Sequence, residues 1–168
     1  ATGDLFGYSV AIDGDLAIVG AHGANQEAGA AFIFVRDNAI WRQQAKLEAN
    51  DSTPGDAFGY SVAVHQQTVI IGAPKNDVVG TDAGAAYVFV QQDEKWIQQA
   101  KLIAADAAIG DQFGIAVTTE KDTAIVGAWL DDIAEPEIGA AIDAGSAYVF
   151  IRQKENWSQQ TKFIADEP

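Results

Sequence analysis

The chain has 168 residues, of which 48% are hydrophobic and 20% charged, as is typical of a packed globular domain rather than a disordered segment. Its formal net charge of −14 repels phosphate backbones and anionic lipid, so we exclude nucleic acid as a partner. No apolar run reaches the roughly 18 residues that a membrane span needs, which excludes membrane insertion. Cysteine is absent, which excludes disulfides, thiolate zinc sites and cysteine nucleophiles.

Four short blocks recur three times along the chain in the same order. All are rich in Val, Ile, Phe and Tyr and are separated by turn signals, so each block predicts a β-strand. No segment shows sustained helical periodicity. The first block covers 4–11, 56–63 and 111–118; the second 17–21, 69–73 and 124–128; the third 28–34, 83–89 and 144–150; the fourth 41–47, 96–102 and 157–163.

The blocks also differ in how far they should be buried. The first three are apolar on both faces, which is typical of strands covered on both sides. The fourth alternates, with Trp41, Gln43, Ala45 and Leu47 on one face and Arg42, Gln44 and Lys46 on the other, so we expect a half-exposed outer strand. Two-residue turns join the first and second strands, at Asp13-Gly14, Gln66-Gln67 and Lys121-Asp122.

Four antiparallel strands graded from buried to exposed, repeated at similar length, predict the blades of a β-propeller. The expected fold is therefore all-β, with three four-stranded antiparallel blades over approximately 4–51, 56–106 and 111–166 of one domain, residues 1–168. Propellers close with about four to eight blades, so three blades make half or part of a ring. We expect a homodimer that closes a six-bladed ring, or further blades in a longer chain.

The repeated turns identify a family resemblance. Phe-Gly precedes each first strand, at Phe6-Gly7, Phe58-Gly59 and Phe113-Gly114, and a glycine followed by alanine ends each second strand, at Gly20, Gly72 and Gly127. With Gly72-Ala73-Pro74 complete, this pattern resembles the FG-GAP repeat of integrin α-subunit heads and many bacterial extracellular proteins. The Trp-x-Gln-Gln outer strand is similar to the shorter bacterial type. The resemblance implies an extracellular or cell-surface protein; no signal peptide is found in this chain, and we expect a mature or excised piece.

FG-GAP blades often hold calcium in a long carboxylate-rich loop between their first two strands. Only tight turns stand there in this chain, so we predict no cofactor and no calcium at those positions. The repeated Asp4, Asp56 and Asp111 are interpreted as turn-shaping residues that accept hydrogen bonds from nearby backbone, and the same applies to Glu27, Asp82 and Asp143. The tryptophans Trp41, Trp96 and Trp157 are predicted to pack between blades, with stacking on a sugar as the alternative.

The connections between second and third strands vary most: His22–Glu27, Pro74–Asp82 and Trp129–Asp143. Strand direction places them on the same face as the links between blades, and variable loops on a rigid scaffold are where binding usually occurs. We therefore predict ligand contacts there and, because the third loop is acidic, calcium as a candidate ligand of that loop alone. The ligand-binding candidates are Trp129, Asp131, Asp132, Glu135, Glu137, Lys75, Asn76 and Asp77; the metal candidates are Asp131, Asp132 and Asp143.

His22 and His65 occupy unrelated repeat positions, and no triad spacing or phosphate-binding glycine loop is present, so we name no catalytic residue and predict that the chain is not an enzyme. The leading hypothesis is an extracellular or surface adhesion scaffold that binds protein or glycan through the loop face. The alternatives are a structural spacer or assembly element, and a non-catalytic fragment of a propeller-containing enzyme that degrades polysaccharide.

Overall fold

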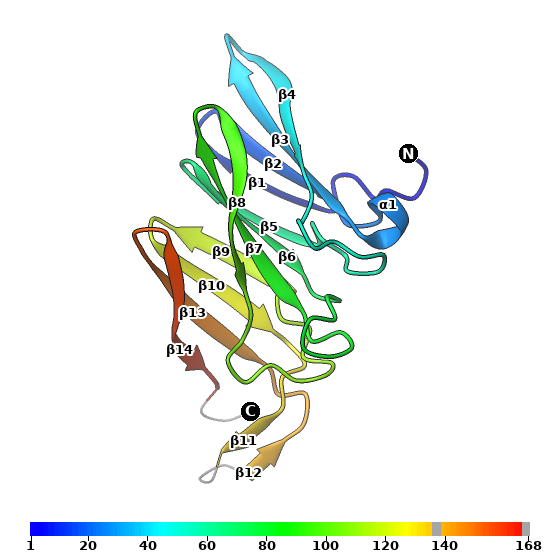
Figure 1. Cartoon of the computed structure of the whole chain (residues 1–168), viewed down its shortest axis with the longest axis vertical. Helices are drawn as coiled ribbons and strands as arrows, with labels where there is room; N and C mark the ends of the chain where they lie inside the picture. The colour runs from blue at the N-terminus through cyan, green and yellow to red at the C-terminus, as the bar shows by residue number, and fades with distance from the viewer. Residues whose placement is uncertain (136–138, 166–168) are drawn as a thin grey trace.

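The computed structural model describes residues 1–135 and 139–165 and contains three four-stranded antiparallel sheets that lie side by side (Figure 1). This confirms the predicted all-β architecture of propeller blades. The first blade holds β1 (Ser9–Asp13), β2 (Leu16–Ala21), β3 (Ala30–Asp37) and β4 (Ile40–Leu47). The second holds β5 (Ser61–His65), β6 (Thr68–Ala73), β7 (Ala85–Gln92) and β8 (Lys95–Leu102). The third holds β9 (Ala116–Glu120), β10 (Thr123–Ala128), β13 (Ser146–Gln153) and β14 (Asn156–Phe163).

Two smaller elements interrupt the connections between second and third strands. In the first blade, α1 (Ala24–Glu27) is one irregular turn, because Asn25 and Gln26 take left-handed backbone angles. In the third blade, β11 (Ile133–Glu135) and β12 (Gly139–Ala141) form a separate small hairpin. The sequence did not predict this hairpin.

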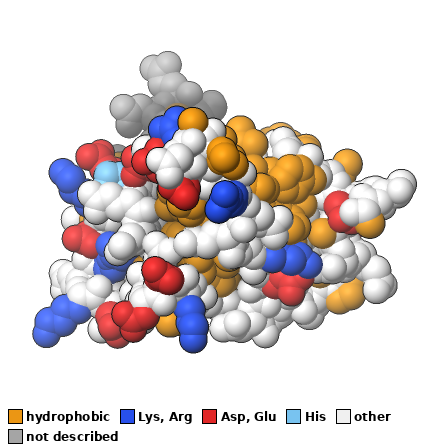
Figure 2. Space-filling view, turned by 90° about the horizontal axis from the view of Figure 1, so that it is seen from above, with side chains coloured by type: hydrophobic (Ala, Val, Ile, Leu, Met, Phe, Trp, Pro, Cys, Tyr) orange, Lys and Arg blue, Asp and Glu red, His pale blue; other side chains and the backbone are white. Residues whose placement is uncertain are grey.

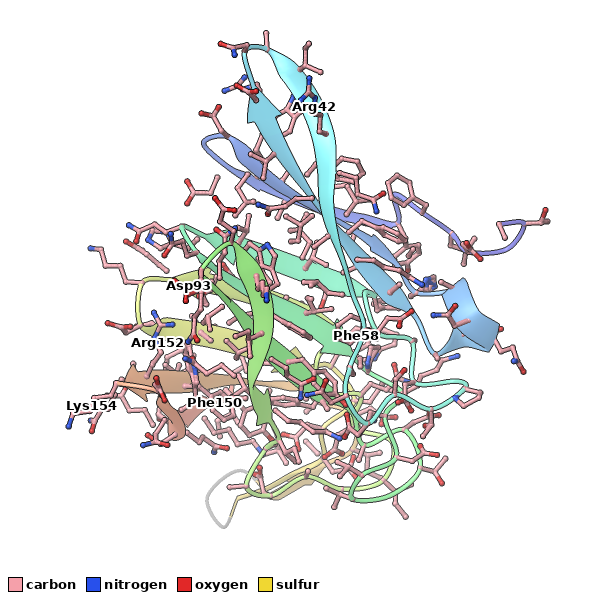
Figure 3. All side chains as sticks on the ribbon, turned by 45° about the horizontal axis from the view of Figure 1, so that its top comes forward. Arg42, Phe58, Asp93, Phe150, Arg152 and Lys154 are labelled. Carbon is pink, nitrogen blue, oxygen red and sulfur yellow. The ribbon has the colours of Figure 1, made fainter. Side chains whose placement is uncertain are left out.

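The hydrophobic core lies between the blades. Phe58 and Tyr87 of the second blade pack with Ile33 of the first in one cluster. A second cluster joins Ile70 of the second blade to Phe113 of the third. Figure 3 shows Phe58 and Phe150 among the sheets, whereas Arg42, Asp93 and Lys154 lie at the outer ends of the hairpins. Each internal junction therefore buries apolar side chains of both adjoining blades.

The Phe-Gly pair forms the turn that leads into each innermost strand. In the second blade, the N–H of Tyr60 donates to the carbonyl of Ala57, and Gly59 takes a φ of 88° as a type II turn requires of its third residue. The turn points Phe58 into the junction with the first blade, where its side chain is fully buried. The motif therefore fixes both the start of the strand and the anchor of the junction.

Two details of the predicted strands were wrong. The first hairpin turn is Gly14-Asp15, one residue later than predicted, because Asp13 still pairs with Leu16 at the end of β1. The outer strands also do not alternate throughout. Each contains a β-bulge, since one glutamine is skipped in the pairing with the third strand, and the glutamines concerned are Gln44, Gln99 and Gln160.

The two outermost blade faces are open. On the first blade, Phe6 and Val10 are 55% and 68% exposed, and on the third blade Phe163 is 53% exposed. Figure 2 looks onto the first-blade end and shows a broad area of hydrophobic side chains there. In the part of the chain that the structure describes, no helix is long and apolar enough to cross a membrane.

Candidate binding face

The long connections and the links between blades lie along one edge of the three sheets, here called the loop face. In Figure 1 they lie to the right, with α1, and at the bottom, with β11 and β12, away from the hairpin turns. A backbone hydrogen bond from Gly110 to Thr81 ties the link between the second and third blades to the β6–β7 connection. The predicted placement of both kinds of loop on one face is confirmed.

The loop face contains two equivalent pockets, of about 210 Å³ in the second blade and about 240 Å³ in the third. Each lies between a blade link, the connection after the second strand, and the lysine near the end of the outer strand. The first is lined by Asp51, Thr53, Asn76, Asp77, Val78 and Lys101. The second is lined by Asp106, Ala108, Asp111, Asp131, Asp132, Ile133, Lys162 and Ile164.

In the second-blade pocket, Asp51 is the central acceptor. Its carboxylate accepts hydrogen bonds from the Tyr87 hydroxyl at 2.9 Å and the Lys101 ammonium at 2.6 Å. Burial alone would raise the pKa of Asp51, but these two donors lower it below the ordinary value. Behind them, the buried Asn76 amide donates to Asp56 at 3.0 Å. The polar side chains at the pocket floor thus form two separate groups, and each group has its hydrogen-bond partners within the protein.

In the third-blade pocket, an aspartate replaces that asparagine. Asp131 stands where Asn76 does, is 3% exposed, and forms an ion pair with Lys162 at 2.6 Å. Lys162 also bonds Asp106 at 2.8 Å; burial would lower its pKa, but the two carboxylates raise it well above the ordinary value. Burial, and then the charge of Asp131, raise the pKa of Asp111. One lysine therefore holds an acidic cluster together.

The comparisons with known proteins agree with this geometry. A sequence-family profile described as the FG-GAP repeat matches residues 1–34, 41–89 and 96–150. The chain belongs to the FG-GAP repeat family. The second and third matches begin on the outer strand of one blade and continue through the inner strands of the next, so the FG-GAP unit spans a blade junction. No curated protein matches the chain.

FG-GAP repeats of this kind form a propeller-type binding or scaffold domain. At two motif positions the second and third repeats make the expected contacts, whereas in the first repeat Asp4 accepts from the Ala1 ammonium and Trp41 is 39% exposed. Asp56 accepts hydrogen bonds from the backbone and hydroxyl of Thr53, and Asp111 accepts one from the Ala108 backbone. The indole N–H groups of Trp96 and Trp157 each donate across a junction to the preceding blade, at 3.0 Å.

The predicted ligand-binding residues of the second FG-GAP blade divide into exposed and internal positions. Lys75 and Asp77 are exposed, and Asp77 accepts a hydrogen bond from the Asp82 backbone. Asn76 is 4% exposed, and its amide bonds Asp56 and the Val78 backbone. Its polar atoms therefore shape the loop, whereas its neighbours face solvent.

The predicted residues of the third blade show the same division. Trp129 is 57% exposed, with its indole N–H held by the Gln112 side chain at 2.9 Å. Both Asp131 and Asp132 line the third-blade pocket, but Asp132 is exposed whereas Asp131 is buried. Glu135 contributes its backbone to β11, and Glu137 lies outside the described residues.

Two of the three carboxylates predicted to bind a metal, Asp131 and Asp132, accept hydrogen bonds from protein donors. Asp131 accepts hydrogen bonds from Lys162 and the Ser146 hydroxyl, and Asp132 accepts one at 2.8 Å from the Asp143 backbone. Among the residues that the structure describes, no group of three or more His, Asp or Glu is placed to hold a metal ion. Calcium in the third loop stays a prediction.

The sequence interpretation missed the two pocket lysines, Lys101 and Lys162, which it assigned only to the outer strand. A signal was present, because an aspartate follows the corresponding lysine by five residues in both links, at Asp51 and Asp106. That aspartate binds the lysine of the next blade rather than the lysine that precedes it. The pairing therefore follows from blade packing and not from spacing along the chain.

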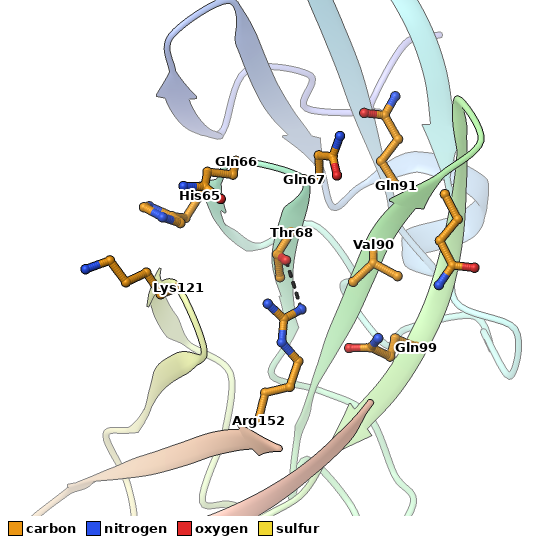
Figure 4. A pocket seen from close by; sticks show the side chains of 10 residues that line it. His65, Gln66, Gln67, Thr68, Val90, Gln91, Gln99, Lys121 and Arg152 are labelled. Atoms are coloured by element: carbon orange, nitrogen blue, oxygen red, sulfur yellow. Dashed lines mark hydrogen bonds between the residues drawn. The ribbon is translucent and has the colours of Figure 1, made fainter. Parts of the chain in front are cut away.

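A further pocket, of about 230 Å³, lies on the opposite side, between the hairpin ends of the second and third blades (Figure 4). The Arg152 guanidinium crosses this groove and donates to the Thr68 hydroxyl at 3.1 Å. Arg152 also pairs with Asp122 and lies over the Trp157 ring. The Arg152 side chain thus links the second and third blades at this junction.

Proposed function

We propose that this FG-GAP chain is a non-enzymatic adhesion scaffold, extracellular or at a cell surface, that binds a protein or glycan through its loop face. The supporting observation is a group of exposed apolar side chains on loops held by rigid blades. Val78, Val79 and Ile109 are 50%, 53% and 75% exposed. Exposed apolar groups rimmed by polar residues are typical of interaction sites.

The charged rim indicates the kind of ligand. Asp77 and Asp132 are exposed beside the two pockets, on a chain with a net charge of −14. An apolar patch with an acidic border fits a basic protein surface, which approaches faster in the field of the opposite charge. Exposed Trp129 offers an aromatic face of the kind on which a sugar ring stacks.

The test is binding of the labelled chain to a glycan array and to intact cells before and after surface proteolysis. The loop-face variant Val79→Glu should abolish binding, whereas Ile97→Glu, a similar change on β8, should retain it. Binding that survives Val79→Glu would overturn the loop face as the site. Release of reducing ends from a polysaccharide by the purified chain would overturn the non-enzymatic assignment, and surface biotinylation of the producing cells tests the location.

A second function, an assembly element, is favoured by the open blade faces at both ends. It does not conflict with ligand binding at Val78, Val79 and Ile109, because these side chains lie on the β6–β7 connection and the link that follows the second blade, away from the end faces.

A further inference from the structure

The two junctions inside the chain are built from the same contacts. Trp96 donates to Gln44 across the first junction, and Trp157 donates to Gln99 across the second, both at 3.0 Å. The Ser9 hydroxyl donates to the Gly59 carbonyl at 2.8 Å, and Ser61 donates in the same way to the next blade at 2.7 Å. Each junction therefore pairs two different blade faces. One face carries the Phe-Gly anchor and the tryptophan, and the other face carries the serine and the bulged glutamine.

The open face of the first blade is the kind that carries the phenylalanine and the tryptophan, and no blade of the described chain packs against it. Its anchor Phe6 is 55% exposed, whereas the equivalent Phe58 and Phe113 are fully buried. An added Cβ at Gly59 would lie 2.4 Å from a carbonyl of the preceding blade, but at Gly7 no described atom lies within 4 Å. We call this surface, with Val10, Ile12 and Trp41, the first-blade face.

The open face of the third blade is the kind that carries the bulged glutamine, and no blade within the described residues packs against it. A Cβ at Gly20 or Gly72 would lie about 2 Å from the carbonyl oxygen of the next blade, at 2.0 and 1.9 Å. At Gly127 the nearest described atom is the Ala116 side chain of the same blade, at 3.6 Å. The bulged Gln160 occupies the position at which Gln44 and Gln99 accept a hydrogen bond from a tryptophan indole N–H. We call this surface the third-blade face.

These two faces match each other in side-chain chemistry. Arg36 occupies the place of Arg152, pairs with Asp15, and lies over Trp41 as Arg152 lies over Trp157. Arg152 reaches the first residue of the neighbouring second strand, Thr68. The same position is a leucine in the first blade and Thr123 in the third. The residue equivalent to Thr68, the partner of Arg152, is therefore Thr123 on the third-blade face.

A loop-face contact extends this match. His22 lies between Tyr8 of its own blade and Tyr60 of the next, with ring centroids 4.2 and 5.1 Å apart. Trp129 occupies the position of His22 and is 57% exposed, and Tyr8 is 52% exposed. Joining the faces would bring these two rings together. One contact is missing, because Ala116 stands where Ser9 and Ser61 supply a hydroxyl.

We propose that two copies of the chain join head to tail, each first-blade face on the third-blade face of the other copy. In this arrangement Trp41 donates to Gln160 and Arg36 donates to Thr123 of the second copy. Two copies supply six blades, within the four to eight of closed propellers, and both open faces of each copy are covered. Association buries the exposed apolar groups of both ends.

The experiment is light scattering behind a sizing column, at about 0.15 M salt so that the like charges of the copies are screened. We expect a mass twice the 17.8 kDa of one chain, stable over about a hundred-fold range of concentration. Val10→Glu and Gly127→Ala should each return the mass to that of one chain. Ile97→Glu is the control and should keep the doubled mass. Circular dichroism and thermal unfolding of each variant establish that it is folded.

A folded parent with the mass of one chain would overturn the proposal and indicate that other blades cover these faces. A ladder of larger species would overturn the closed ring. Pairing of two first-blade faces would be insensitive to Gly127→Ala, and pairing of two third-blade faces to Val10→Glu, so either pattern would overturn the head-to-tail arrangement. If Val79→Glu lost ligand binding but kept the doubled mass, ligand binding through the loop face and pairing through the end faces would be shown to be independent.

Discussion

The first and second blades carry closely similar motifs but differ in their surroundings. The second blade has a neighbour on both faces, and its Phe58 and Val62 are 0% and 9% exposed. The equivalent Phe6 and Val10 of the first blade are 55% and 68% exposed. The strand registers are nevertheless the same in the two blades. The comparison shows that local sequence determines the strands and turns, whereas the adjacent blade determines what is buried.

The largest expected effect tests this difference directly. Phe58→Ala removes a buried ring that packs on Tyr87 and Phe89, with centroids 5.5 and 6.1 Å apart. We expect the free energy of unfolding to fall by about 4 kcal/mol, from lost apolar burial and an added cavity. Phe6→Ala, made in the Gly127→Ala background to exclude association, should cost about 1 kcal/mol. Urea unfolding measures both, and equal losses would remove the distinction between the two blades.

The glycines at the ends of the second strands give the next effect. In Gly72→Ala, the added methyl lies 1.9 Å from the Gly114 carbonyl, so the blades must separate, and we expect a loss of about 3 kcal/mol. In Gly127→Ala, the methyl makes only ordinary contacts, with Ala116 at 3.6 Å and the Ile115 side chain at 3.8 Å, so the isolated chain should change by less than about 0.5 kcal/mol. Thermal unfolding of the two variants is the measurement, made in the Val10→Glu background in which two copies do not pair. A severe loss from Gly127→Ala in that background would contradict an open third-blade face on the single chain.

The repeats made most of this fold predictable. The recurring Phe-Gly and the Trp-x-Gln-Gln strand fixed the number of blades and the inter-blade role of Trp96. The bulges were not predictable, because an extra glutamine beside another glutamine leaves no change in polarity to mark it. The hairpin of β11 and β12 was missed since strands of three residues are too short to show alternation.

The candidate site was predictable only as a surface. Loop length and acidity indicated the loop face and the exposed Asp77 and Asp132. They did not distinguish Asn76 and Asp131, whose side chains turn inward to partners from other segments. The link that contains Asp106 and the strand that contains Lys162 are far apart in sequence, and the blade packing that joins them has no local signature.

A smaller effect concerns the serine that crosses each internal junction. Ser61→Ala removes a hydrogen bond of 2.7 Å to the Gly114 carbonyl, which should lower the free energy of unfolding by about 1 kcal/mol. Ala116→Ser adds the same hydroxyl to the third-blade face, where the isolated chain has no blade to receive it. We expect this variant to leave monomer stability unchanged and to tighten the pairing of two copies, as measured by dilution. Destabilised pairing would contradict the equivalence of the junctions.

The smallest effect compares the two loop-face pockets through their pH dependence. Burial and the charge of Asp131 raise the pKa of Asp111, so the folded chain binds more protons than the unfolded chain just above the ordinary aspartate pKa of about 3.9. From this group alone, the free energy of unfolding falls as pH rises through that window. Asp131→Asn recreates the second-blade arrangement and removes the neighbouring charge. The pKa of Asp111 should then decrease.

The substitution should change the pH-dependent contribution of Asp111 to the free energy of unfolding by less than about 1 kcal/mol, since one pKa unit corresponds to about 1.4 kcal/mol. Carbon-13 NMR titration of the aspartate carboxyls is therefore the primary measurement, and urea unfolding across the same pH range is the second. The matched change Asn76→Asp places a second carboxylate beside Asp56, and the repulsion of the two like charges should lower the free energy of unfolding at neutral pH. If Asp111 titrated identically in the parent and in Asp131→Asn, the two carboxylates would not interact. The difference between the pockets would then lie in the Lys162 ion pairs alone.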